Sequence, residues 1–400
     1  ELKIQTIFPR IMWYDETIKN MAFQRDKVLG SCMTEDEEEA KMLNAILDEL
    51  KLNALVITDP YNMRHVSGFR GGGGEGALYI SAAQKVLITD SRYTEQAGKE
   101  SDFTVIEECR GHNRQTILKE CMEKENVSGD FHMGYEDQSM LCCDFDKLRK
   151  ELPVQTWTPL GSRIDDLRQV KTEEELEYLA RAEEIGDKAF AEFLKIVKPG
   201  MTELEAAAEL EYLMKKEGAE DLSFNTIIAS GLNSSMPHAI PGYKKLEEGD
   251  FVTCDFGCKY KGYCSDMTRT FVLGKASDKQ KEIYNVVLKA QLAGLAAVKA
   301  GVSGASVDKV ARDIITEAGY GDCFGHGLGH SVGLFIHESP RLSPSDDTIL
   351  KANMIETVEP GIYVPGFGGV RIEDMVVVTE DGCRNLAHSP KELIEVPVEK

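Results

Sequence analysis

The sequence predicts an α+β protein in two parts, a smaller α/β domain followed by a larger α+β domain made of two similar halves. Three observations support this fold class. Strands and helices alternate up to about residue 160, as in α/β domains. Beyond that point a helical segment recurs in the sequence, and so does an acidic β-hairpin. With 400 residues, 42% of them hydrophobic, the chain can form two cores.

The first domain is predicted from its pattern of strands and turns. Residues 1–33 match no pattern, and we treat them as an extension of unknown role. Thr34 can cap a helix over 35–51, with Glu37 completing a capping box. Predicted strands follow at 54–58, 76–80, 85–90 and 103–108. We therefore place the first domain at 34–165 and the second at 166–400.

The second domain contains an internal repeat. When the segment 188–221 is moved forward by 101 residues, eight of its 34 positions are identical, without a gap. His238-x-x-Pro241 likewise recurs as His337-x-x-Pro340. A tandem repeat is the simplest cause of such similarity. The sequence thus predicts two halves related by a pseudo-twofold axis, with a site between them.

The first half carries a pair of acids on a predicted hairpin. Runs rich in β-branched and aromatic residues, 250–257 and 263–273, flank a short connection. If the turn is centred on Tyr260 and Lys261, Asp255 lies opposite Asp266. Cross-strand Cβ atoms are about 5 Å apart, so the two carboxylates would repel each other unless a proton or a cation lies between them. A metal ion is the economical explanation.

The second half repeats this arrangement. In the segments 354–361 and 369–379, alternation places Thr357 with Glu359 on one face, and Arg371 with Glu373 on one face. A Thr-x-acid-x-Gly pattern contains Asp255 in the first copy and Glu359 in the second, 104 residues later. The acids therefore occupy equivalent positions in the two halves.

Histidines complete the candidate site. His326, His330 and His337 lie in a glycine-rich segment, 324–340. A helix would place the three imidazoles on one face, but the glycines favour a strand or a loop. Four carboxylates and an imidazole suit Mn²⁺, Co²⁺, Fe²⁺ or Zn²⁺ and argue against Cu⁺ or a thiolate zinc site. The set of Asp255, Asp266, His330, Glu359 and Glu373 predicts a dinuclear centre for metal-assisted hydrolysis.

Composition excludes several other functions. A net charge of −22 disfavours nucleic acid and anionic membranes as partners. No apolar run reaches the length of a membrane span, no signal-peptide region is expected at the start, and ten cysteines suggest a reducing compartment. We therefore predict a cytoplasmic protein. Gly71–Gly74 lacks the lysine of a phosphate-binding loop. Cys254, Cys258 and Cys264 resemble a zinc cluster, but Cys254 should face away from Asp255 on its strand, which argues against a structural zinc site.

At the level of motifs, the chain resembles the creatinase, prolidase and methionine aminopeptidase superfamily. The resemblance covers about residues 40–396 and is carried by SGLNSSMPHAIPG, DFVTCDFG, GYCSDMTRTF, HGLGHSVGLFIHE, ETVEPGIYV and GVRIEDMVVV. It implies the pita-bread fold, preceded by a creatinase-type N-terminal domain. Within the superfamily the chain is most similar to Xaa-Pro peptidases. The implied function is aminopeptidase P-like hydrolysis of an N-terminal Xaa-Pro bond, with Xaa-Pro dipeptidase as the alternative and a catalytically silent binding protein as a weaker one.

The resemblance also implies roles for individual residues. Two ions, with Mn²⁺ as the first choice, would be held by all five ligands, with Asp266 and Glu373 bridging and Glu359 also moving a proton. His238 and His337 would contact the substrate, His326 would be a further pocket histidine, and Arg371 would be a partner of the acids. A proline-containing peptide is the implied substrate. A homodimer is the implied assembly.

Overall fold

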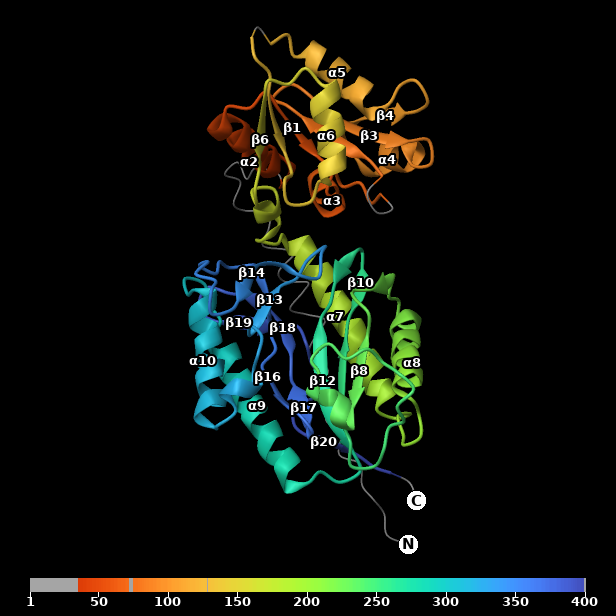
Figure 1. Ribbon diagram of the computed structural model, residues 1–400, viewed down its shortest axis with the longest axis vertical. Coiled ribbons are helices and arrows are strands. Elements are labelled where there is room, and N and C mark those ends of the chain that lie inside the picture. The colour runs from red at the N-terminus through yellow and green to blue at the C-terminus, as the bar shows by residue number, and fades with distance from the viewer. Residues whose placement is uncertain (1–34, 72–74, 128, 399–400) are drawn as a thin grey trace, which may run out of the picture.

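The computed structural model describes residues 35–71, 75–127 and 129–398 and consists of two bodies joined by a short segment (Figure 1). The predicted extension 1–33 and the predicted cap Thr34 lie outside the described residues. The predicted first helix is present as α2, Glu35–Leu50. No helix among the described residues is long and apolar enough to cross a membrane.

The N-terminal body is a six-stranded mixed sheet with helices on its faces (Figure 1). The four predicted strands are confirmed as β1 to β4, and two further strands extend the sheet, giving the order β4-β3-β2-β1-β5-β6. The strands are β1 Ala54–Ile57, β2 Ala77–Ile80, β3 Lys85–Asp90, β4 Thr104–Glu108, β5 His132–Tyr135 and β6 Thr156–Pro159. The helices after α2 are α3 Pro60–Ser67, α4 Thr94–Glu100, α5 Arg114–Lys124 and α6 Cys142–Glu151.

The C-terminal body contains two helix pairs on opposite sides of its strands (Figure 1). One pair is α7 Glu173–Phe193 with α8 Glu203–Lys216, and the other is α9 Asp278–Ala297 with α10 Gly304–Glu317. Both ends of α8 and α10 differ by the predicted offset of 101 residues. Gly200 and Gly301, in the equivalent turns before these helices, adopt φ values of 92° and 85°, which glycine favours. The internal repeat is therefore structural.

Each helix pair packs on strands of its own half. In the first half, β8 Ile227–Ser230, β9 Phe251–Phe256 and β12 Met267–Leu273 form one sheet with β20 Ile394–Val396. In the second half, β15 Ile355–Val358, β18 Asp374–Val378 and β19 Cys383–Asn385 form another sheet, and β16 Gly361–Val364 pairs with β17 Gly368–Arg371. The remaining elements are β7 Asp221–Leu222, β10 Cys258–Tyr260, β11 Tyr263–Cys264, β13 Gly329–Ser331 and β14 Glu338–Leu342, with 3₁₀ turns η2 Asp165–Arg168, η3 Gly231–Ser235 and η4 Gly321–Cys323.

The predicted register of the first hairpin is wrong. Asp255 pairs with Thr268 rather than with Asp266, which precedes β12. Tyr260 pairs with Tyr263, so the two turn residues are Lys261 and Gly262. Both have positive φ, 49° and 75°, as a two-residue hairpin turn of type I′ requires. Because Gly262 takes part in the turn, the turn lies one residue later than predicted and the strand pairing is shifted by two residues.

A buried acid in β15 gives a test of stability. Glu356 is fully buried, and neither of its carboxylate oxygens has a hydrogen-bond partner. Burial, opposed by Lys171, raises the pKa of Glu356 well above its ordinary value. An unfolded glutamate ionises at about pH 4.3. Above that pH the folded protein therefore holds a proton on Glu356 that the unfolded chain has lost. The stability of the folded state must therefore fall as the pH rises.

We expect Glu356→Met to raise the free energy of unfolding by about 2 kcal/mol at pH 8, the typical cost of an unsatisfied buried polar group. The gain should be smaller at pH 5, where the unfolded glutamate is closer to neutral. Urea unfolding at both pH values measures the difference. A gain that does not depend on pH, or a loss of stability at pH 8, would contradict this account of Glu356.

Candidate metal centre

Three of the five predicted ligands form a compact buried group. One ligand atom each from Asp266, His330 and Glu373 lies within 4.8 Å of the other two. Asp266 precedes β12, His330 lies in β13, and Glu373 joins β17 to β18. His330 Nε2 is 3.5 Å from Asp266 Oδ2 and also 3.5 Å from Glu359 Oε1. The structure thus brings together acids from both halves of the repeat, with the histidine between them.

The fifth predicted ligand, Asp255, is not one of the three grouped residues. Its Oδ2 accepts a hydrogen bond of 2.6 Å from Arg371 Nη2. Its Oδ1 is buried without a hydrogen-bond partner. A buried carboxylate oxygen needs a donor or a cation, and a metal ion would satisfy it. The charge of Asp255 also contributes to raising the pKa of Asp266, Glu359 and Glu373.

The four acids cannot all be ionised without added positive charge. Burial, followed by the charges of Glu373, Asp255 and Glu359, raises the pKa of Asp266 well above its ordinary value. Burial and the charge of Glu359 do the same for Glu373. Like charges in a low-dielectric site repel strongly. The donor set therefore fits divalent cations, which would neutralise the acids and lower these pKa values.

His330 is prepared as a neutral ligand. Its Nδ1 lies 3.0 Å from the carbonyl oxygen of Ser331, which can only accept, so Nδ1 carries the proton. Nε2 is then unprotonated and faces the carboxylates. Burial lowers the pKa of His330 to about 3. A hydrogen bond from the second ring nitrogen is the usual way in which proteins orient a metal-binding histidine.

Two threonines that the sequence did not single out as site residues orient the acids from behind. Thr268 Oγ1 donates to Glu373 Oε2 at 2.6 Å and accepts from Arg371 Nε at 3.0 Å. Thr357 Oγ1 donates to Glu359 Oε1 at 3.3 Å, which agrees with the predicted shared face, and accepts from the backbone N–H of His330 at 3.1 Å. The feature of the sequence that could have indicated Thr268 is its position two residues after Asp266.

Arg371 links the ligands to a further hydrogen-bonded chain. Its Nη1 donates to the hydroxyl of Tyr363 at 2.8 Å, so the single hydroxyl proton of Tyr363 is free to go to His326 Nε2, 2.9 Å away. His326 Nδ1 then donates to the carbonyl of Gly327 at 2.7 Å. His326 lies at the end of this chain and is not among the three grouped ligands. Tyr363 had no signal in the sequence, because only the fold brings it to Arg371.

The two predicted substrate histidines are exposed, as substrate contacts must be. The ring of His337 lies 4.6 Å from that of His330, centre to centre, at 75°. His238 follows η3, and its charge helps to lower the pKa of both His326 and His337. The carbonyl of the preceding residue, Pro237, accepts from Arg371 Nη1 at 3.4 Å. One histidine from each half therefore lies beside the site.

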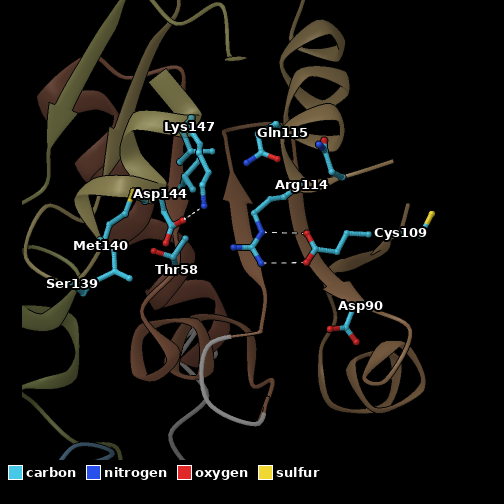
Figure 2. A pocket seen from close by; sticks show the side chains of 14 residues that line it. Thr58, Asp90, Cys109, Arg114, Gln115, Ser139, Met140, Asp144 and Lys147 are labelled. Carbon is cyan, nitrogen blue, oxygen red and sulfur yellow. Dashed lines mark hydrogen bonds and ion pairs between the residues drawn. The ribbon is translucent and has the colours of Figure 1, made fainter. Parts of the chain in front are cut away.

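A separate cavity lies in the N-terminal body. It has a volume of about 580 Å³ and lies where β1, β3 and β4 end. Its two cations are already paired, Arg114 with Glu108 and Lys147 with Asp144 (Figure 2). None of its lining residues belongs to the buried ligand group. The candidate metal ligands therefore lie in the C-terminal body and not at this cavity.

A duplicated α+β fold whose halves each supply acids to one buried, histidine-containing centre defines a class, the metal-dependent hydrolases. Comparison of the chain with models of known protein families identifies the family. Residues 177–380 match Metallopeptidase family M24, and residues 40–170 match the Creatinase/Prolidase N-terminal domain. The chain belongs to metallopeptidase family M24 and is a metallopeptidase with the pita-bread fold.

Relatives and solved structures agree. The Xaa-Pro dipeptidase of Pyrococcus furiosus is 40% identical, over 90% of this chain and 100% of that protein. The structure of an Xaa-Pro dipeptidase from Bacillus anthracis matches with a TM-score of 0.86 and 40% identity, covering 90% of this chain and 99% of that one. The X-Pro aminopeptidase from Thermotoga maritima MSB8 matches with a TM-score of 0.81 and 39% identity, covering 87% and 99%.

Proposed function

We propose that this protein hydrolyses the bond between an N-terminal residue and a following proline, using two divalent ions held by the five acidic and histidine ligands. The observation that carries the proposal is the buried group of Asp266, His330 and Glu373, in a chain about 40% identical to Xaa-Pro dipeptidases and an X-Pro aminopeptidase. When bound, such ions activate water and polarise the scissile carbonyl. The oxygen-rich donors suit Mn²⁺ best in our proposal, with Co²⁺, Zn²⁺ and Fe²⁺ as alternatives.

Glu359 is the residue that we assign to proton transfer. Its side chain is 17% exposed, against 6% for Asp266, so it is more accessible to a substrate. Burial and the charge of Asp255, opposed by Arg371, raise the pKa of Glu359 in the absence of ions. An Xaa-Pro bond has no N–H, and its leaving nitrogen must gain a proton. Glu359 would take a proton from water and return it to that nitrogen.

Arg341 bears on the length of the substrate. It pairs with His330 across β13 and β14, and its charge lowers the pKa of His330 and His337. Its side chain is exposed, and the ion pairs found among the described residues do not include it. An unpaired guanidinium beside the site suits a carboxylate. This observation favours Xaa-Pro dipeptides, whose carboxylate directly follows the scissile bond, whereas a longer-peptide aminopeptidase does not need such a cation.

We expect Arg341→Leu to raise KM for Ala-Pro at least about tenfold, the loss of one charge-assisted contact, while kcat/KM for Ala-Pro-Ala changes less than about twofold. Steady-state kinetics with both peptides at saturating Mn²⁺ measure this. Arg384→Leu, at an exposed arginine on β19, is the matched control. Equal effects on both peptides would remove the role of Arg341 in choosing dipeptides. Failure of the wild-type protein to cleave either peptide would refute the proposed function.

His337 is assigned as a donor to the developing oxyanion. Burial lowers its pKa, so near pH 7 it is neutral and donates one N–H. We expect His337→Ala to lower kcat about 100-fold, a typical loss for one such donor, with the fold and metal content unchanged. Stopped assays over a range of substrate concentrations separate kcat from KM. An effect confined to KM would argue against stabilisation of the transition state.

Several wider proposals remain from the sequence. We propose that 34–165 and 166–400 are the two domains, that the protein is a homodimer, and that it acts on peptides in the cytoplasm without nucleic-acid or membrane partners. Supporting observations are the net charge of −22 and the free thiol state of the described cysteines, which suits a reducing compartment. Sedimentation analysis tests the assembly.

A further inference from the structure

A buried ionic cluster lies where the two bodies meet. We call Asn62, Arg168, Lys171 and Glu338 the junction cluster. Glu338 accepts hydrogen bonds from Arg168 Nη1 and, at 2.9 Å, from Lys171 Nζ. The side chains of Arg168, Lys171 and Glu338 are 8%, 1% and 4% exposed. Such charges are stable in a protein interior only when each is paired, so the positions of these three side chains depend on one another.

Asn62 ties this cluster to the N-terminal body. Its Oδ1 accepts from Arg168 Nε at 2.8 Å, and its Nδ2 donates to Glu136 Oε1 at 2.9 Å. Glu136 in turn accepts from the backbone N–H groups of Thr58 and Asp59, at the end of β1. Hydrogen bonds therefore run without a break from the N-terminal sheet to Glu338.

Glu338 is at the same time part of the site segment. It follows His337 in the chain and pairs with Ser331, the residue after His330, across β13 and β14. Its Oε1 also accepts from the backbone N–H of Phe335 at 3.1 Å, which closes the turn before His337. Although burial opposes its ionisation, Lys171 and Arg168 hold the pKa of Glu338 below its ordinary value. An ionised Glu338 thus fixes the turn and the strand on either side of His337.

A series of aromatic contacts also links the N-terminal body to the segment of His337, independently of the hydrogen bonds. The ring of Tyr61, in α3 of the N-terminal body, lies 5.1 Å from that of Phe335. Phe335 lies 6.2 Å from His337, and His337 lies 4.6 Å from His330, all between ring centres. Rings at these separations contact each other edge to face or tilted. The N-terminal body therefore contacts the segment of His337 through both polar and aromatic groups.

We propose that the N-terminal domain positions the active site of its own chain, with Glu338 and Tyr61 as positioning residues that hold His337 beside the metal centre. The inference rests on the proposed hydrolysis of Xaa-Pro bonds. Neither residue touches the substrate in this scheme. Loss of either contact lets the segment 333–338 shift, and a displacement of about 1 Å at a catalytic group is enough to lower turnover strongly.

The test measures kcat and KM for Ala-Pro, with metal content and circular dichroism, in Glu338→Gln and in Tyr61→Leu. We expect kcat to fall about 100-fold in the first and about tenfold in the second, with KM changed less than threefold and metal content as in the wild type. Glu338→Asp, which keeps the charge, should recover part of the loss. Glu395→Gln is the control, since Glu395 pairs with Lys275 at the surface.

Unchanged kcat in folded, metal-loaded variants would overturn the proposal. So would a fall in kcat that follows metal loss, because the cluster would then support the ligand His330 rather than His337. If Glu338→Gln does not fold, Tyr61→Leu decides by the same two criteria. A wild-type protein that does not cleave Ala-Pro would instead count against the proposed function, and the positioning role would fall with it.

Discussion

Glu359→Gln is expected to lower kcat for an Xaa-Pro peptide by about 10³-fold or more while most of the metal stays bound. General acid–base groups contribute about 10² to 10⁴ in rate, and Glu359 would act twice, on water and on the proline nitrogen. Glutamine keeps the size and one ligand oxygen, and Thr357 Oγ1 can still donate to it. The other predicted ligands, Asp255, Asp266, His330 and Glu373, are untouched.

Turnover and metal content must be measured on the same preparation, the latter by elemental analysis after gel filtration. Glu380→Gln, an exposed glutamate after β18, is the matched control and should behave as the wild type. Near-normal turnover in Glu359→Gln would contradict its role as the base. Complete loss of metal would mean that the variant reports on binding and not on proton transfer.

Asp266→Asn should abolish metal binding and turnover together. Its effect on stability should have opposite signs in the two states, with the variant more stable than the wild type without metal and less stable with it. Asp266 is almost fully buried, and burial and the charges of Glu373, Asp255 and Glu359 raise its pKa. At pH 8 the metal-free wild type must either keep Asp266 ionised beside its neighbours or take up a proton on folding, and Asp266→Asn removes this cost. It also removes a carboxylate ligand from the metal-loaded protein, whose stability includes the free energy of binding.

In excess chelator at pH 8, Asp266→Asn should therefore unfold at a higher urea concentration than the wild type. With Mn²⁺ at about 100 times its dissociation constant, the wild type should gain about 3 kcal/mol and become the more stable of the two. Asp381→Asn, at an exposed position, controls for the change of net charge. A variant that is less stable than the wild type under both conditions would show that Asp266 is a structural residue and not one of a crowded set of ligands.

The sequence indicated the grouped residues Asp266, His330 and Glu373, because the acids lie in motifs of alternating strand residues and the histidine lies in a glycine-rich segment. The repeat and the face shared by Thr357 and Glu359 needed only this local periodicity. The register of the first hairpin was mispredicted by two residues, because Lys261 and Gly262 form the turn and a turn of that kind sets the pairing. Periodicity fixes the face of a residue, and turn geometry fixes its partner.

Contacts between distant segments could not be predicted in this way. Tyr363 reaches Arg371 and His326 only after β16 and β17 pair. Glu338 meets Arg168 and Lys171 across some 170 residues of chain, and nothing in the local sequence of either segment indicates the other. Such contacts depend on how packed elements meet. They are also the contacts that set the orientation of the site.

The central claim, a dinuclear metal centre that cleaves Xaa-Pro bonds, is tested most directly by titrating metal-free protein with Mn²⁺ while bound metal and Ala-Pro hydrolysis are both measured. Dinuclear hydrolytic sites hold their ions roughly 3.5 to 4 Å apart and act through both. The account predicts about two ions per chain at saturation, no turnover in chelator, and activity that rises with occupancy. Full hydrolysis by metal-free protein, or two bound ions without any Xaa-Pro hydrolysis, would contradict it.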